Sequence, residues 1–207
     1  MGRLPRVARS SQPWAGGLNP VGIAETKIGA SGLASSVRIS ANAALSANAK
    51  FVLKRIKTPV RGATGGHFAI VASSYNKRYV DGMVRAAEKC LRAARVATLK
   101  VVRVPGAYEI PVAAARLAER HAPPLDAILC LGVILRGATT HAQHIGEAVT
   151  NALTQIQLQH GIPVIHEVLL FENKEQAEVR CLSRDHNRGA EAAQTALEMA
   201  RVMRELD

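Results

Sequence analysis

Aromatic residues and long apolar runs are both scarce in this chain of 207 residues. Phe, Tyr and Trp together make up 3% of the sequence, although 48% of it is apolar. Ala, Val, Ile and Leu supply most of that apolar fraction, which predicts a core of small and branched aliphatic side chains, as in sheets covered by helices. No apolar run approaches the ~18–20 residues that a helix needs to span a bilayer, so we expect no membrane span.

Cysteine is also rare, which limits the use of disulfides and metals. Cys90, Cys130 and Cys181 are far apart, odd in number and without CxxC or Cys/His ligand spacing. This pattern predicts neither a disulfide framework nor a zinc site, and we expect no bound metal. A reducing compartment is the simplest location for such a chain.

Acidic residues are outnumbered by basic ones, and the formal net charge is +11. Residues 1–65 hold ten Lys or Arg and one acid, Glu25, so their net charge is +9 and that of residues 66–207 is +2. The second segment is therefore nearly neutral. Because it also carries no sequence signature of a nucleic-acid-binding fold, we expect no nucleic-acid partner.

The basic N-terminal segment differs from the rest of the chain in composition. Residues 1–65 mix Gly, Ser, Ala and Asn with scattered Arg and Lys and show no sustained apolar period. We interpret them as a disordered extension and residues 66–207 as the folded domain. The same composition would suit an organelle transit peptide, a tether to anionic partners or a misassigned start codon. We expect a cytoplasmic protein, or an organellar one if the extension is a transit peptide.

Short apolar runs alternate with segments of helical period along residues 66–207. The predicted strands cover residues 68–72, 101–104, 127–135 and 164–170, and the predicted helices cover residues 80–96, 111–120, 145–160 and 190–206. The strands are read as continuously apolar, which is typical of parallel strands buried on both faces. The sequence therefore predicts an α/β three-layer sandwich, a four-stranded parallel sheet flanked by helices in a flavodoxin-like topology.

Such a sheet binds ligands beyond the carboxyl ends of its strands. The segments at those ends are residues 73–76, 105–109, 136–144 and the stretch after Leu170. The third of them enters a helix, so its backbone N–H groups and the helix dipole favour an anion such as phosphate. A helix start capped by threonine is the alternative, because Thr hydroxyls often satisfy free N–H groups there.

The polar residues of these segments, taken together, resemble the 6,7-dimethyl-8-ribityllumazine synthase family over about residues 67–206. The motifs that carry the resemblance are residues 72–76 (ASSYN), 104–111 (VPGAYEIP), 131–141 (LGVILRGATTH), 161–165 (GIPVI), 187–192 (NRGAEA) and 196–200 (ALEMA). The resemblance implies a transferase of riboflavin biosynthesis. That enzyme condenses 5-amino-6-(D-ribitylamino)uracil with 3,4-dihydroxy-2-butanone 4-phosphate to 6,7-dimethyl-8-ribityllumazine and releases phosphate and water.

The resemblance also implies partners and cofactors. The family uses no metal or organic cofactor, so the partners expected are the two small-molecule substrates and further copies of the chain. Family members form pentamers, in some cases packed into icosahedral shells, and their active sites lie between neighbouring subunits. The sequence does not choose between a pentamer and a larger shell.

By residue-to-residue match, the resemblance assigns roles to particular side chains. His141 is expected to move protons, which imidazole can do near neutral pH. Ala138, Thr139 and Arg180 are expected to hold the phosphate, with the guanidinium as the charged partner. The residues expected to contact the pyrimidine substrate are Tyr75, Ala107, Tyr108, Glu109, Val133, Ile134, Leu135 and His166.

Structural roles remain open for several of these residues when the sequence is taken alone. His141 and His144, one turn apart, could both be histidines on a helix surface, and His144 is a rival for proton transfer. Tyr75 could be an exposed loop tyrosine, and residues 133–135 could be core. Arg180 could belong to the solvated face of residues 175–180.

The chain departs from the family pattern at two places. His166 and Glu167 follow Val164-Ile165, where many members have Phe, so an aromatic wall contributed by the adjacent subunit is altered. Arg184 and Arg188 stand in a stretch where the family commonly shows Lys, and Arg is not a neutral exchange for Lys. These changes put substrate affinity or rate in question more than the type of reaction.

Three other functions are compatible with parts of the sequence. A catalytically weak homologue that binds flavin or lumazine as a shell protein would fit the two departures. A receiver-like domain would need clustered acids at strand ends, where the chain has Ser73, Ser74 and Arg136. A nucleic-acid-binding protein would rest on the basic extension alone. Turnover of substrate, or its absence, would separate these possibilities.

Overall fold

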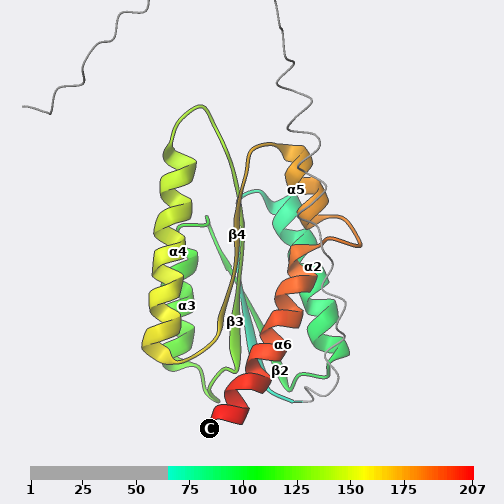
Figure 1. The fold of residues 1–207 in the computed structure, drawn as a ribbon, viewed down its shortest axis with the longest axis vertical. Helices are drawn as coiled ribbons and strands as arrows, with labels where there is room; N and C mark the ends of the chain where they lie inside the picture. Colours follow the sequence, from blue (N-terminus) through cyan, green and yellow to red (C-terminus); the bar gives the residue numbers. More distant parts are fainter. Residues whose placement is uncertain (1–64) are drawn as a thin grey trace, which may run out of the picture. The chain divides into compact units, whose positions relative to one another are not determined.

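The structure is a computed structural model that describes residues 65–207 (Figure 1). The predicted N-terminal extension, residues 1–65, lies outside the described residues apart from Gly65. The elements in chain order are β1 (His67–Ser73), α2 (Lys77–Ala93), β2 (Thr98–Val104), α3 (Ile110–Arg120), β3 (Ala127–Leu135), α4 (His141–His160), β4 (Val164–Phe171), α5 (Lys174–Cys181) and α6 (Arg188–Leu206). In this part of the chain no helix is both long and apolar enough to cross a membrane.

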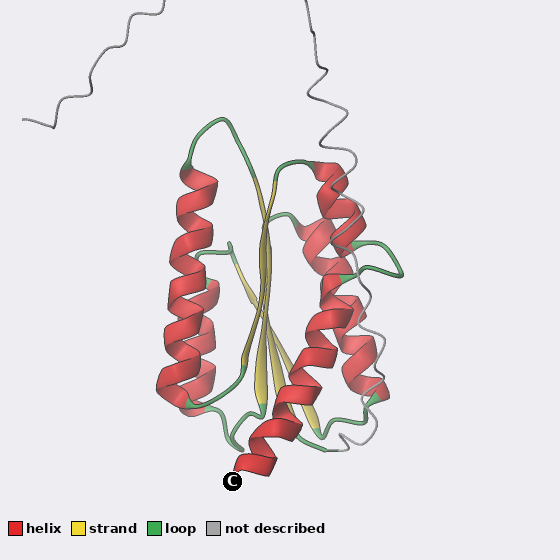
Figure 2. Ribbon diagram, in the orientation of Figure 1, coloured by secondary structure: helices red, strands yellow, loops and turns green. Residues whose placement is uncertain are grey.

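The strands form one parallel sheet in the order β2-β1-β3-β4. Helices α3 and α4 cover one face of the sheet, and α2, α5 and α6 cover the other (Figures 1 and 2). This arrangement confirms the predicted three-layer sandwich with flavodoxin-like strand order. All four strands end at the same edge of the sheet, so the polar segments that follow them are brought into one region.

The central strand β3 explains why a continuous apolar run was the correct signal there. Its residues alternate between two cores. Leu129, Leu131 and Val133 pack with α2, α5 and α6, whereas Ile128, Cys130 and Ile134 pack with α3 and α4. Each such fully buried side chain contributes about 1.5–3 kcal/mol relative to an exposed one. An alternating strand could not have filled both cores.

The strand β2 shows that the same prediction was wrong at the edge of the sheet. Four of its seven residues are exposed, and Val104 is the one that is buried. The strand pairs with β1 alone, so its outer edge and much of its surface face solvent. Lys100 and Arg103 are compatible with that position, because charged side chains are common on edge strands.

The helices also differ from the prediction in places, and α4 begins at His141 rather than at residue 145. Helix α2 ends at Ala93 rather than Val96, because Arg95 adopts a left-handed conformation with φ 57°. Residues 174–181 form a separate helix, α5, that the sequence did not predict. Its N-cap residue Asn173 accepts a hydrogen bond from the backbone N–H of Gln176 at 2.9 Å. With only Ala177 and Cys181 buried, α5 has too narrow an apolar face for a clear helical period.

The connection from α5 to α6 is held by a buried asparagine. The side-chain amide of Asn187 donates to the carbonyl of Cys181 at 2.6 Å and to that of Gly82 at 3.5 Å. Helices α2 and α6 also approach closely, since a Cβ on Gly189 would lie 2.0 Å from the carbonyl oxygen of Met83. These contacts fix where α5 lies, and with it Arg180.

Candidate active site

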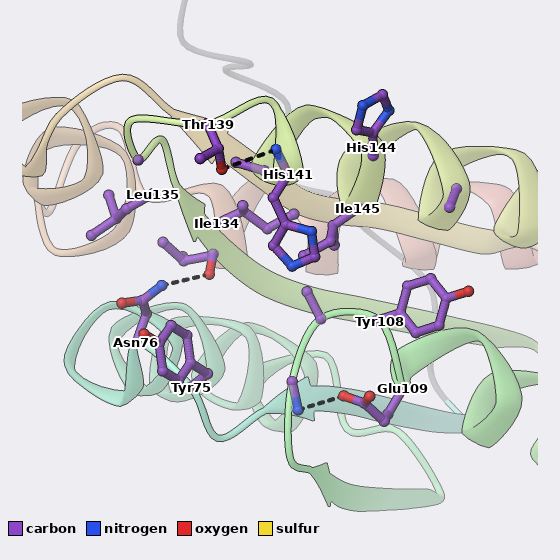
Figure 3. Close-up of a pocket in the computed structure, with 16 residues that line it drawn as sticks. Tyr75, Asn76, Tyr108, Glu109, Ile134, Leu135, Thr139, His141, His144 and Ile145 are labelled. Atoms are coloured by element: carbon purple, nitrogen blue, oxygen red, sulfur yellow. Dashed lines mark hydrogen bonds between the residues drawn. The ribbon is translucent and has the colours of Figure 1, made fainter.

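A pocket of about 870 Å³ lies at the carboxyl ends of β1, β2 and β3 (Figure 3). Its walls come from the loops after these strands and from the first two turns of α4. The lining residues are Tyr75, Asn76, Gly106, Ala107, Tyr108, Glu109, Val133, Ile134, Leu135, Gly137, Thr139, His141, Ala142, His144, Ile145 and Ala148. A cavity of this size at a strand edge can take a drug-sized ligand.

The loop after β1 places Tyr75 at one end of the pocket. Its backbone N–H donates to the carbonyl of Pro105 at 3.0 Å, so the loops after β1 and β2 are tied together. Asn76 follows in a left-handed conformation with φ 55°, and its side-chain amide donates to the carbonyl of Val133 at 2.8 Å. Asn76 was not among the predicted site residues, although Asn before a helical segment is a signal for such a turn.

The loop after β2 is shaped by a glycine and a carboxylate. The backbone N–H of Gly106 donates to Oε2 of Glu109 at 2.8 Å, and a Cβ on Gly106 would lie 2.7 Å from that oxygen. A larger residue at position 106 would therefore push aside the Glu109 carboxylate that closes this turn. One oxygen of Glu109 holds the turn closed, and Ala107 is buried against α3, whereas Tyr108 is 62% exposed. The Tyr108 ring stands beside the pocket in Figure 3.

Helix α4 brings both predicted histidines to the pocket, with different orientations. The His141 ring points toward the middle of the pocket, whereas the His144 ring points outward from the helix (Figure 3). The geometry therefore favours His141 as the group that can reach a bound ligand. The residue before it, Thr140, makes no side-chain capping bond, and Thr139 Oγ1 accepts from the His141 N–H only at 3.4 Å. The start of α4 is thus weakly capped by threonine.

The charge of the pocket does not match a phosphate ligand. Among its lining residues, all in the described part of the chain, there is no Lys or Arg, and Glu109 is the one carboxylate. The nearest arginine in sequence, Arg136, is bonded through Nε to Oε1 of Glu172 at 2.9 Å. An anionic ligand would therefore find backbone N–H groups and histidines here, without a permanent cation.

Three predicted site residues do not line this pocket. Ala138 lies between Gly137 and Thr139, which do line it. Arg180 is on α5, in the layer on the opposite face of the sheet from α4 (Figure 1). His166 is on the edge strand β4, and its Nε2 lies 2.8 Å from Oγ1 of Thr150. The predicted site is thus divided, in one copy of the chain, between the pocket and a second region around β4 and α5.

The His166 ring is half-buried between β4 and α4. Its Nδ1 accepts a hydrogen bond from the backbone N–H of Val168 at 3.2 Å. Burial lowers the pKa of His166 below its usual value, because water no longer solvates the charged form. Both the lowered pKa and the lone pair that Nδ1 offers to the Val168 N–H favour the neutral ring.

Glu167, which with His166 departs from the family pattern, forms a buried ion pair. It is 5% exposed and receives two hydrogen bonds of 2.8 Å from Arg188, which also bonds Glu191 at 2.5 Å. Burial raises the pKa of Glu167, and the Arg188 guanidinium opposes that shift. The guanidinium of Arg188 is thus paired with two carboxylates of its own chain. Arg184 is exposed and takes part in none of the ion pairs found among residues 65–207.

The similarity of this chain to known proteins agrees with the fold and the pocket. The model of the 6,7-dimethyl-8-ribityllumazine synthase family matches residues 65–204. The chain belongs to the lumazine synthase family.

Curated lumazine synthases are similar over most of the chain. The 6,7-dimethyl-8-ribityllumazine synthase of Stenotrophomonas maltophilia (strain R551-3) is 40% identical over 149 residues, which cover 71% of this chain and 95% of that protein. The one from Xanthomonas oryzae pv. oryzae (strain PXO99A) is 41% identical over 140 residues, or 66% and 88% of the two chains. These matches confirm the family that the sequence motifs indicated.

Membership of the lumazine synthase family leaves the roles of single residues as predictions. The predicted pyrimidine contacts that meet in the pocket are Tyr75, Ala107, Tyr108, Glu109, Val133, Ile134 and Leu135, together with Thr139 and His141. Residues 133–135 line the pocket and also pack in the two cores, so they can contact substrate and belong to the core at the same time. His166 and Arg180 lie elsewhere in the fold.

Proposed function

We propose that this protein carries out the condensation that gives its family its name, in the pocket at the ends of β1, β2 and β3. There, 5-amino-6-(D-ribitylamino)uracil and 3,4-dihydroxy-2-butanone 4-phosphate form 6,7-dimethyl-8-ribityllumazine with loss of phosphate and water. The observation that carries this proposal is the convergence of three strand ends, with most of the predicted contacts, on one cavity next to His141.

The walls of the pocket suit a flat heterocycle with a hydroxylated chain. The Tyr75 ring offers an aromatic face, and the aliphatic residues 133–135 form the floor. The free lone pairs of Glu109 and the backbone groups of residues 107–109 can bind ring N–H groups and ribityl hydroxyls. Holding the two substrates in one orientation supplies much of the rate, because the substrate amine is itself the nucleophile.

His141 is the group that we assign to proton transfer. Attack of the amine on the ketone forms a carbon–nitrogen bond, and the later loss of water and of phosphate requires protons to be moved. An imidazole at the start of α4, pointing into the pocket, can accept a proton from the amine and deliver it to a leaving oxygen. The backbone N–H groups at the helix start stabilise the departing phosphate.

The cation for that phosphate comes, in our proposal, from a second copy of the chain. Since no Lys or Arg lines the pocket among the described residues, Arg180 of one copy would complete the pocket of the next copy and bring His166 with it. Such head-to-tail contacts close into rings, and we propose a pentamer.

The test of the activity is absorbance-monitored lumazine formation by the full chain, with phosphate release measured in parallel. Wild-type protein should produce both products in equal amounts, and His141→Ala should lower kcat while the assembly stays intact by sedimentation. A folded assembly that binds the pyrimidine substrate but releases no phosphate would contradict the proposal. It would favour a lumazine-binding shell protein instead.

The sharing of the site between copies has its own test, which mixes two impaired variants and measures activity at a butanone phosphate concentration below the wild-type KM. His141→Ala damages the pocket, and Arg180→Ala damages the proposed contribution of the next copy. If each site takes one part from each of two copies, dissociating and reassembling an equal mixture should restore about a quarter of the sites. Recovery of no activity from mixed assemblies would mean that both residues act within one copy.

A further inference from the structure

The His166 ring is held by a chain of three hydrogen bonds that nothing in the resemblance assigns. The backbone N–H of Val168 donates to Nδ1 at 3.2 Å. Nδ1 therefore carries a lone pair, and in the neutral ring the proton lies on Nε2. Nε2 can then only donate, and its partner is Oγ1 of Thr150 at 2.8 Å.

Thr150 completes the chain in the direction that this tautomer requires. Its hydroxyl donates to the carbonyl of Gly146 at 2.8 Å, which leaves a lone pair of the oxygen free to accept from Nε2. Each of the three donors, the Val168 N–H, the His166 Nε2–H and the Thr150 hydroxyl, thus has one acceptor. The opposite tautomer, with the proton on Nδ1, would place two N–H groups against each other at Val168.

The position of Thr150 on α4 separates it from the catalytic side of that helix. At about 100° per residue, Thr150 lies on the opposite side of α4 from His141. One side of the helix therefore lines the pocket, while the other side holds a ring at the β4 edge. Thr150 is exposed, so its hydroxyl is not needed to fill a core.

We propose that Thr150 is a positioning residue for substrate binding, which acts by fixing the orientation and tautomer of His166. This inference rests on the proposed function, in which His166 of one copy forms a wall of the next copy's pyrimidine site. An imidazole covers less area than the phenyl ring found in many family members, and its ring can rotate. Holding the ring by both nitrogens presents one flat, neutral face to the pyrimidine.

The expected effect is on affinity for one substrate. A side chain that must be ordered on binding costs about 0.5–1.5 kcal/mol, which corresponds to a change of about two- to tenfold in KM. Thr150→Val removes the hydroxyl and keeps the shape. It should raise the KM for the pyrimidine substrate by about two- to tenfold, with kcat and the KM for the butanone phosphate unchanged. Thr150→Ser, which keeps the hydroxyl, should restore the wild-type KM.

A double-variant experiment shows whether Thr150 acts through His166. His166→Phe supplies a ring that needs no hydrogen bond, so adding Thr150→Val to it should change neither KM. If Thr150→Val raises the KM as much in the His166→Phe background as in the wild type, Thr150 acts independently of the ring and the inference is wrong. An unchanged KM in the single variant would overturn it as well.

Two further measurements keep this inference distinct from the proposed function. If His166→Ala leaves the KM for the pyrimidine unchanged, the placement of His166 in the neighbouring site fails, and the inference fails with it. If His166→Ala raises the KM and Thr150→Val does not, only the inference fails. Nitrogen-15 spectra of histidine-labelled wild-type protein, with His166→Phe for assignment, should show Nε2 protonated, and a protonated Nδ1 would overturn the inference without any variant of Thr150.

Discussion

The pocket at the ends of β1–β3 and the region around β4 and α5 are built from different materials. The pocket has aliphatic walls, two tyrosines, histidines and backbone groups, and no Lys or Arg among its described residues. The region around β4 and α5, which we call the edge region, holds His166, Glu167, Arg180, Arg184 and Arg188. Within it, Glu167 and Arg188 form an ion pair, and a chain of hydrogen bonds holds His166.

This difference indicates which parts of the active site one copy supplies and which parts come from its neighbour. A parallel sheet with crossover helices gathers its strand ends by topology alone, so a single chain supplies the cavity and the proton-transfer group. The permanent positive charge that a phosphate requires lies on another face of the fold. Changes in the pocket should therefore affect the chemistry, and changes in the edge region should affect affinity or stability.

The largest effect should follow from removal of the His141 imidazole. His141→Ala is expected to lower kcat by about 10²- to 10⁴-fold, because a positioned general acid–base contributes that much. His144→Ala is the matched control, since its ring points outward from α4 and its loss should change kcat little (Figure 3). Steady-state kinetics on both variants decide this, and equal losses of kcat would assign proton transfer to the pair.

The next effect concerns stability and lies in the edge region. Glu167→Gln removes one of the two carboxylates that pair with Arg188, at a site where Glu167 is 5% exposed, and leaves Glu191 as the other. We expect the free energy of unfolding to fall by about 1–3 kcal/mol, the cost of losing a charged hydrogen-bonded partner at a buried site. Urea unfolding measures this. Glu191→Gln removes one bond instead of two and should cost less, so a larger loss there would mean that Glu191 is the main partner of Arg188.

A smaller effect should separate the three arginines of the edge region. Arg180→Ala is expected to raise the KM for the butanone phosphate by at least about tenfold, because one charge-assisted hydrogen bond contributes about 1.5–3 kcal/mol. Arg184→Ala should raise the same KM less. Arg188→Ala should lower stability and leave this KM near the wild-type value, since its guanidinium already binds Glu167 and Glu191. A rise in the KM for Arg188→Ala equal to that for Arg180→Ala would contradict this division.

The parts of the fold that the sequence predicted well are those in which burial leaves a pattern. β3 is apolar throughout because both of its faces are covered, and its end leads directly to His141. β2 was misjudged because an edge strand has fewer neighbours, and its Lys100 and Arg103 tolerate solvent. Helix α5 was missed because two buried residues in eight do not produce a helical period.

The division of the site was harder to predict for a different reason. The resemblance expects the wall at His166 to come from the adjacent subunit, but it does not say which copy supplies Arg180 or what holds the His166 ring in place. The hydrogen bonds of His166 with Thr150 and the pairing of Glu167 with Arg188 join residues far apart in sequence. Neither pairing follows from local spacing, because strand register and helix rotation decide which side chains meet.

The smallest expected effect is the pH dependence that His166 adds to stability. Burial lowers its pKa in the folded protein below the unfolded value of 6.5, so the unfolded chain binds the proton more readily. Stability should therefore fall as the pH drops from above 6.5 toward the folded pKa and become independent of this group below it. Thermal unfolding at pH 7.5 and 5.5 should show a larger decrease in Tm for wild-type protein than for His166→Phe, which has no proton to gain. If both proteins lose the same Tm, burial at the β4 edge does not disfavour the charged form of the His166 ring, and the difference drawn between the edge region and the pocket loses this support.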